Sequence, residues 1–246
     1  MNYLCGMKFF DFKDLIVFEN DNYVLINKPP YIATLDERTP DAKGMSILRM
    51  AKKVYDDAQV AHRLDKETSG VLAIAKNPEA YRHLAIQFEK RQVEKMYHAV
   101  TIGIHDFQGV MVDLPILALP TGAVKIDRSG GKEATTIFTT KEVFKQNTLV
   151  ECMPLTGRMH QIRIHLSCLS APIVSDTQYG GKMLFLSEIK RDFRLKRHTE
   201  ELPLIQRVAL HAHTLSFRDL NNEIITATAP YPKDIAALLK QLRNNS

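Results

Sequence analysis

Residues 71–75 form an apolar run that directly follows a Thr-Ser-Gly turn, and this run predicts a buried strand. Just ahead of the turn, the sequence places Asp65 close to Arg63 and a second basic residue. A carboxylate fixed near the start of a buried strand beside cations is expected to stay ionised, so it can act as a nucleophile or base. An Asp beside an Arg is more often a structural ion pair, so this pair alone does not decide its role.

Short apolar segments separated by polar turns are frequent along the chain, which is typical of antiparallel strands. We expect an α+β fold with a largely antiparallel mixed sheet flanked by helices. Because no Pro-, Gly- or Ser-rich linker divides residues 1–246, we expect one domain. The expected strands are residues 15–18, 23–26, 95–102, 135–138, 148–153, 215–217 and 224–229. One helix is expected at residues 45–55, and Asn77 and Pro78 open a second one. A third is expected after Gly157 with Met159, Ile162 and Leu166 facing inward, and a last helix buries Ile235, Leu238, Leu239 and Leu242.

The composition excludes several classes of protein. Apolar residues make up 45% and charged residues 25% of the chain, as in an ordinary globular protein. No apolar stretch approaches the roughly 18 residues of a membrane span, and the first residues do not resemble a secretory signal. The three cysteines have no paired spacing, so we expect reduced thiols and a cytoplasmic location.

The net charge of +5 is too small to indicate a partner by itself. Residues 182–198, however, hold six Lys or Arg residues against two acidic ones. This segment is either a solvated helix face or an insertion that contacts phosphates. Its candidate substrate-binding residues are Lys190, Arg191, Arg194 and Lys196.

The string TGRMHQIRIH at residues 156–165 is the second unusual segment. On a helix whose apolar side holds Ile162 and Leu166, Arg163 lies at the boundary of the apolar stripe. A guanidinium there either reaches water or pairs with an anion. Both readings stay open from the spacing alone.

A metal site is not expected. His160, His165, His211 and His213, with Cys168 nearby, are the possible ligands, but the two in the predicted helix are five residues apart, a poor spacing for one helix face. The chain contains no CxxC, HExxH, GxGxxG or GxxxxGK[ST] motif, so neither a metal nor a nucleotide cofactor is indicated.

The two strings together identify a resemblance. HRLDKETSG at residues 62–70 resembles the HRLDxxTSG signature of the RluA-type RNA pseudouridine synthases, and residues 156–165 resemble their TGRxHQIRxH motif. Further matches follow in family order over about residues 15–230. They are NKP at 27–29, VEKMYHAV at 93–100, GKEATT at 131–136, APIVSD at 171–176, YGG at 179–181, LHA at 210–212 and AP at 229–230.

This resemblance implies a role for each of four residues. Asp65 corresponds to the catalytic carboxylate and Arg163 to the arginine that pairs with it. Tyr97 corresponds to the tyrosine that stacks on the target base and is a candidate for proton transfer at C5. From its residue type alone, a tyrosine in a strand is more often a packing residue. Arg63 is the candidate for filling the space left by the flipped base.

The implied protein has the pseudouridine synthase catalytic fold, acts on a stem-loop of ribosomal or transfer RNA, and uses no cofactor. No membrane and no obligate protein partner is indicated, and the S4-type RNA-binding domain of many relatives is expected to be missing. Ala171 and Ser175 depart from the family pattern, as does the Pro-Tyr pair after NKP. These departures affect loop geometry and substrate choice more than chemistry.

Three questions stay open from the sequence. Asp65 either attacks C1′ or removes the 2′ proton. A rival interpretation is an RNA-binding protein of the same fold that lacks catalysis. Another is a hydrolase using His62 and Asp65, but a glycosidase normally needs a second carboxylate, and the nearest, Glu67, need not face the same site.

Overall fold

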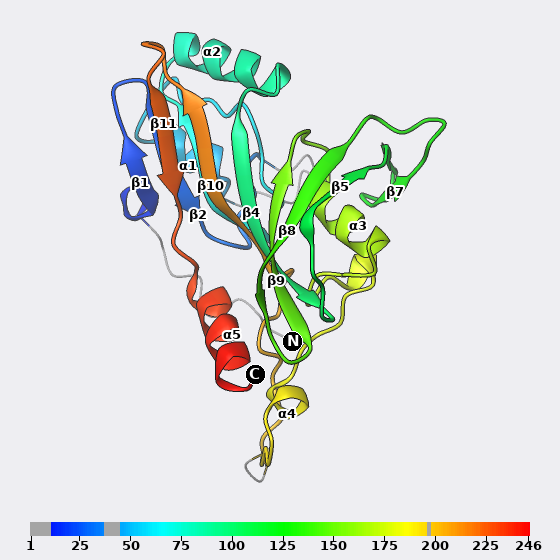
Figure 1. The fold of residues 1–246 in the computed structure, drawn as a ribbon. Helices are drawn as coiled ribbons and strands as arrows, with labels where there is room; N and C mark the ends of the chain where they lie inside the picture. Colours follow the sequence, from blue (N-terminus) through cyan, green and yellow to red (C-terminus); the bar gives the residue numbers. More distant parts are fainter. Residues whose placement is uncertain (1–10, 37–44, 196–197) are drawn as a thin grey trace.

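The computed structural model describes residues 11–36, 45–195 and 198–246 (Figure 1). Within them, one large sheet contains the strands β1 (Ile16–Glu19), β2 (Tyr23–Lys28), β3 (Ser69–Ala75), β4 (Glu94–Ile102), β5 (Gln108–Asp113), β8 (Thr135–Val143), β9 (Asn147–Pro154), β10 (Leu210–Arg218) and β11 (Ile224–Thr228). Their order is β1-β2-β3-β10-β4-β9-β8-β5, and β11 pairs with β10. Only the β3–β10 pair among these is parallel. The expected α+β fold with a largely antiparallel mixed sheet is confirmed.

Shorter elements complete the fold. A separate hairpin joins β6 (Ile116–Ala118) to β7 (Val124–Ile126). The helices are α1 (Ile47–Lys52), α2 (Pro78–Glu89), α3 (Gln161–Cys168), α4 (Leu186–Ile189) and α5 (Lys233–Asn244), with 3-10 turns η1 (Phe12–Leu15) and η2 (Thr177–Tyr179). In the described residues, none of the helices has the length and hydropathy that a bilayer crossing needs.

Strands β2 and β3 are covered on both faces, because their side chains alternate between two apolar clusters. Tyr23 and Leu25 pack in one cluster with Leu84 of α2, whereas Ile26 packs in another with Ile47 of α1. All seven residues of β3 are buried, so the strand predicted from the apolar run is confirmed. This double burial fixes the strand that leads directly out of the Asp65 loop.

The second half of the sheet packs against α3 and α5. Ile162 and Leu166 share a cluster with the α5 residues that the sequence predicted as buried: Ile235, Leu238, Leu239 and Leu242. The prediction that Met159 also faces inward is wrong, since this side chain is 37% exposed. The helix begins only at Gln161, and the preceding His160 has a left-handed φ of 53°, which turns Met159 away from the helix face.

Gly70 lies where the parallel pair of β3 and β10 brings two backbones very close. Its φ is +116°, and a Cβ atom there would lie 2.0 Å from the Ala212 carbonyl oxygen. We therefore expect Gly70→Ala to destabilise the protein by about 3 kcal/mol or more, because both the backbone strain and the overlap must be relieved. Chemical denaturation measures the change. Gly109→Ala is the control, since Gly109 also has a positive φ but an open Cβ position, and equal losses in the two variants would contradict the close-approach argument.

Candidate active site

The loop of residues 62–68 carries Asp65 and is tied to the body of the protein by buried hydrogen bonds. The Thr34 hydroxyl accepts from the Leu64 N–H at 3.1 Å and donates to the Leu64 carbonyl at 3.0 Å. On the other side of Asp65, the Lys66 carbonyl accepts from the ammonium of Lys28, a fully buried residue, at 3.2 Å. The backbone on both sides of Asp65 is therefore held in place.

Arg207 extends this anchoring to the C-terminal helix. Its fully buried guanidinium donates to the Glu67 carbonyl at 3.0 Å and to the Ser69 hydroxyl at 3.1 Å. The same guanidinium binds both carboxylate oxygens of Asp234 in α5, at 2.7 and 3.0 Å. Arg207 thus links α5 to the end of the Asp65 loop.

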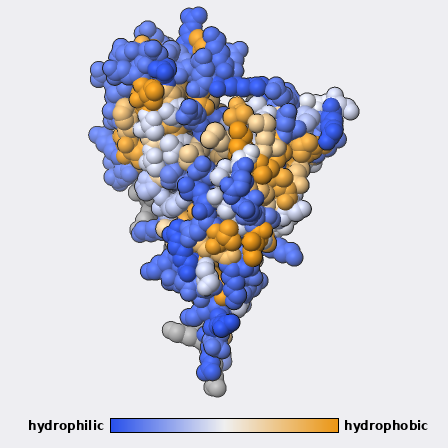
Figure 2. Space-filling view, viewed as in Figure 1, coloured by the Kyte–Doolittle hydropathy of each residue, from blue (hydrophilic) through white to orange (hydrophobic). Residues whose placement is uncertain are grey.

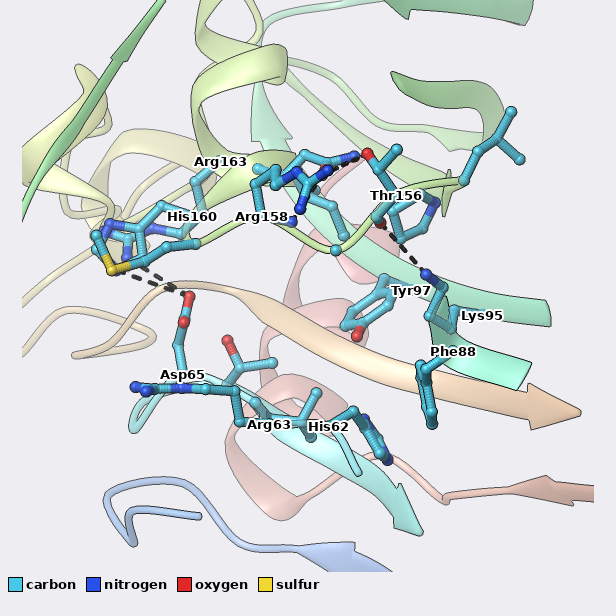
Figure 3. Close-up of a pocket in the computed structure, with 18 of the residues that line it drawn as sticks. His62, Arg63, Asp65, Phe88, Lys95, Tyr97, Thr156, Arg158, His160 and Arg163 are labelled. Carbon is cyan, nitrogen blue, oxygen red and sulfur yellow. Dashed lines mark hydrogen bonds and ion pairs between the residues drawn. The ribbon is translucent and has the colours of Figure 1, made fainter. Parts of the chain in front are cut away.

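The loop before α3 is organised by Gln161. The Gln161 side-chain oxygen accepts from the Thr156 hydroxyl at 2.8 Å and from the Arg158 N–H at 2.9 Å. Its amide donates to the Thr135 carbonyl at 2.9 Å. These bonds hold residues 156–160 in a tight turn, from which the side chain of His160 points toward Asp65 (Figure 3).

Asp65 faces two nitrogen-bearing side chains across this space. One carboxylate oxygen lies 3.8 Å from Nη1 of Arg163 and 3.9 Å from Nε2 of His160 (Figure 3). The Asp65 side chain is 27% exposed, so it is open to a ligand. The structure therefore brings together the two residues that the sequence strings suggested.

The principal partner of Arg163 is nevertheless Asp176. Arg163 donates to both of its carboxylate oxygens, at 2.7 and 2.8 Å, and Asp176 is only 1% exposed. Burial opposes the charge of Arg163, but the hydrogen bonds and charge of Asp176, with the charge of Asp65, raise its pKa above the usual value. Arg163 is thus a permanently charged, rigid group with its remaining Nη1 facing Asp65.

Tyr179 supports both neighbours of Asp65. Its ring lies under the Arg163 guanidinium, 4.9 Å from ring centroid to Cζ, and its hydroxyl is 2.8 Å from His160 Nδ1. Burial lowers the pKa of His160, an effect that Asp65 opposes and Arg163 reinforces, so the imidazole is neutral near pH 7. When the Tyr179 hydroxyl donates to Nδ1, this neutral ring carries its proton on Nε2, which faces Asp65.

Asp65, Arg163 and Tyr97 line one cleft with a volume of about 710 Å³. Tyr97 comes from β4 and packs against two apolar clusters while its ring borders the cleft. Burial, with the negative charge of Asp65, raises the pKa of the Tyr97 hydroxyl, which therefore stays protonated. Arg63 is exposed and lines the same cleft.

Three of the basic residues predicted to bind the substrate lie outside the cleft that holds Asp65. Lys190, Arg191 and Arg194 are exposed but do not line the cleft. They follow α4 in the narrow tip at the bottom of Figure 1, whose surface is mostly hydrophilic in Figure 2. Lys196 lies outside the described residues. The assignment of this segment to phosphate contacts stays a prediction.

The geometry does not favour the hydrolase interpretation. His62 Nε2 accepts from the Ala73 N–H at 3.0 Å, and burial, with the charge of Lys95, lowers the His62 pKa to about 3. Glu67 accepts from the Val208 N–H at 3.2 Å and does not line the cleft. Neither residue is placed as a partner for Asp65.

In the described parts of the chain, no group of three or more His, Cys, Asp or Glu side chains is arranged to hold a metal ion. Two of the histidines considered from sequence have both ring nitrogens engaged. His165 contacts the Thr136 hydroxyl and the Leu114 carbonyl, and His211 contacts the Ser69 hydroxyl and the Ala229 carbonyl. These rings hold the fold together.

Sequence reasoning missed Asp176 and Tyr179 as site residues. Both belong to segments that resemble family motifs, APIVSD and YGG, but neither motif by itself predicts a side-chain role. His160 was considered only as a possible metal ligand. Asp176 lies 13 positions after Arg163 in the sequence. Their pairing is visible only in the folded chain, where η2 packs against α3.

Comparisons with known proteins identify the family of this chain. The family model described as RNA pseudouridylate synthase matches residues 22–168. The chain is 35% identical over 237 residues to ribosomal large subunit pseudouridine synthase D of Xanthomonas campestris pv. campestris, covering 94% of this chain and 70% of that protein. It is 31% identical over 234 residues to ribosomal large subunit pseudouridine synthase C of Vibrio parahaemolyticus, covering 95% and 70%.

Among solved structures, human RNA pseudouridylate synthase domain containing 4 aligns with a TM-score of 0.67 and 25% identity, covering 94% of this chain and 95% of that one. Fold, sequence and family model therefore point to the same group of enzymes. The chain belongs to the RNA pseudouridylate synthase family and is an RNA pseudouridine synthase, an isomerase.

Proposed function

We propose that this enzyme converts a uridine of ribosomal RNA to pseudouridine and that Asp65 is its catalytic carboxylate. The observation that carries the proposal is the position of Asp65, open to the cleft and facing Arg163 and His160. Uridine isomerisation breaks the N1–C1′ bond, turns the base, and joins C5 to C1′. The C5 proton leaves and N1 gains a proton, so no oxidant or group donor is consumed.

Asp65 can serve this reaction in two ways, as a nucleophile at C1′ or as a base toward the 2′ proton. In either case the charge of Arg163 attracts and orients the Asp65 carboxylate, because the position of Arg163 is itself fixed by Asp176. The Tyr97 ring offers a platform for the turned base, and its protonated hydroxyl is the candidate for proton exchange at C5. Arg63, exposed at the cleft, is the candidate for filling the space left by the flipped uridine.

The substrate class is inferred from relatives. Two similar proteins are named for the RNA of the ribosomal large subunit, which favours ribosomal over transfer RNA as the substrate. Because chemistry on the base requires it to leave the stack, the target is proposed to be a uridine in a loop or stem-loop. These two relatives come from bacteria and are named for the ribosomal large subunit, so the proposal includes a cytoplasmic location.

Tritium release tests the proposal. Ribosomal RNA transcribed with [5-³H]uridine should lose tritium to water during incubation with the purified enzyme, while the RNA chain stays intact. Transfer RNA transcripts labelled in the same way provide the comparison. Chain cleavage or free uracil would indicate a hydrolase, and binding without tritium release from either RNA would indicate a protein without synthase activity.

The exposed basic residues after α4, called the basic tip, give a separate prediction. If Lys190, Arg191 and Arg194 contact RNA phosphates, replacing all three by Ser should lower affinity and flatten the log K versus log[salt] slope by up to about 0.7 per lost contact on single strands. A second triple variant, with Lys52, Lys53 and Lys240 replaced by Ser, removes the same charge from exposed positions away from the cleft. Equal slopes for the two variants would favour a tip that contacts no phosphate.

A further inference from the structure

The cleft extends well beyond the surroundings of Asp65. Its other end is lined by Phe88 from the last turn of α2 and by Arg91 and Lys95 at the entry to β4. In Figure 3, Phe88 and Lys95 lie on the side of Tyr97 that is away from Asp65. No step of the proposed reaction uses these side chains.

Phe88 and His62 form a rigid aromatic pair at this end. Their rings are stacked, with centroids 4.6 Å apart and planes at 22°. His62 is fixed by the Ala73 N–H, and Phe88 packs against the apolar cluster beneath α2. Both residues nevertheless line the cleft, so they present a preorganised flat surface to a ligand.

Lys95 brings a positive charge beside this pair. Its half-buried ammonium donates to the Thr156 carbonyl at 3.3 Å, and no carboxylate of a described residue lies within 4.0 Å of it. Burial, with the charge of Arg91, lowers the pKa of Lys95 to about 8, so the group remains mostly charged at neutral pH. A charged, partly desolvated ammonium with unused donors favours an anionic ligand.

Two arginines also line the cleft with Lys95, and one of them is paired with a carboxylate. Arg91 is held by both carboxylate oxygens of Glu133, at 3.0 and 2.8 Å, and Arg158 donates to the Glu133 carbonyl at 2.9 Å. Both arginines line the cleft, whereas Glu89 is the acidic residue on this side. A flat aromatic surface next to a cationic group matches one nucleotide of single-stranded RNA.

We propose that this end of the cleft is a second nucleotide subsite, in which a base next to the target uridine stacks on the Phe88–His62 pair and its phosphate binds Lys95. The inference rests on the proposed function, since it takes RNA as the substrate. It adds that recognition includes an unpaired neighbour of the uridine. A base stacked on an aromatic side chain gains affinity whatever its identity, so the subsite selects for an unpaired nucleotide more than for a sequence.

A binding cycle tests the stacking. The probes are a trinucleotide UUU and a trinucleotide with a central uridine flanked by abasic ribonucleotides, and NMR titration measures the dissociation constants. For the wild-type enzyme we expect removal of the flanking bases to weaken binding by roughly 5- to 150-fold. In Phe88→Leu, which keeps the side-chain bulk but removes the aromatic face, the two trinucleotides should bind almost equally.

Matched controls separate stacking from folding. Ile86→Ala changes an apolar residue of α2 that does not line the cleft, and should keep the full effect of the flanking bases. An undiminished effect in Phe88→Leu, with unchanged thermal unfolding, overturns the stacking.

The phosphate contact has its own measurement. Lys95→Gln should flatten the log K versus log[salt] slope for UUU by about 0.7, whereas Lys90→Gln, an exposed lysine outside the cleft, should leave it unchanged. An unchanged slope in Lys95→Gln overturns the phosphate contact. Tritium release from ribosomal RNA by the wild-type enzyme is scored separately, so loss of the subsite does not count against the synthase activity, and absence of tritium release counts against the proposed function alone.

Discussion

The Asp65→Asn variant is expected to lose at least about 10⁴-fold in turnover, because an amide is neither a nucleophile toward C1′ nor a base toward the 2′ proton. Its fold should be unaffected. Asp65 is partly exposed, and the main partner of Arg163 is Asp176, so no buried charge is left unpaired. Single-turnover tritium release measures the rate, and RNA affinity is expected to change little.

Glu67→Gln is the matched control for this variant. Glu67 lies in the same loop, does not line the cleft, and accepts a hydrogen bond that a glutamine oxygen can also accept. Its rate should stay near that of the wild type. Multiple turnover by purified Asp65→Asn would remove Asp65 from the catalytic role, and activity lost only in Glu67→Gln would move that role to Glu67.

The Arg163→Met variant is expected to lose both rate and stability. Removing the guanidinium leaves Asp176 as a buried, unpaired carboxylate, and breaking a buried ion pair in this way costs about 3–5 kcal/mol of unfolding free energy. The rate should fall by orders of magnitude because Asp65 also loses its orienting cation. A lower rate alone therefore does not reveal which of the two carboxylates matters for chemistry.

The double variant Arg163→Met with Asp176→Asn separates the two effects. The neutral amide removes the unpaired charge, so part of the lost unfolding free energy should return. The single-turnover rate at saturating RNA should remain low, since Asp65 still lacks its cation. If the double variant instead recovers both stability and rate, Arg163 acts only by holding the structure together.

The sequence predicted the local elements well where burial follows a simple period. The apolar run of β3, the capped start of α2 and the inward face of α5 were all visible in the chain. Strands β5, β6 and β7 were not predicted. Each is short or largely exposed, so its burial pattern is too weak to predict a strand.

The site was predicted residue by residue but not as a network. The strings around Asp65 and Arg163 led to both residues, whereas Asp176 and Arg207 act through partners that only the folded chain brings close. A buried ion pair has no periodic signature, because its cost and benefit depend on geometry alone. The aromatic pair of His62 and Phe88 was missed for the same reason, since its members lie on separate elements.

The parallel pairing of β3 with β10 has a consequence for folding. Ser69, which follows the Asp65 loop, forms a hydrogen bond with His211, 142 residues later in the chain. Arg207, four residues before His211, also donates to the Ser69 hydroxyl. Contacts between such distant residues form slowly because a large loop must close first. During synthesis, the Asp65 loop can bond Thr34 and Lys28 early, but it cannot form its bonds to Arg207 and His211 until those residues have been added. A nascent chain therefore contains the complete HRLD string long before the Asp65 loop is fully anchored. Synthase activity should arise only near the end of synthesis.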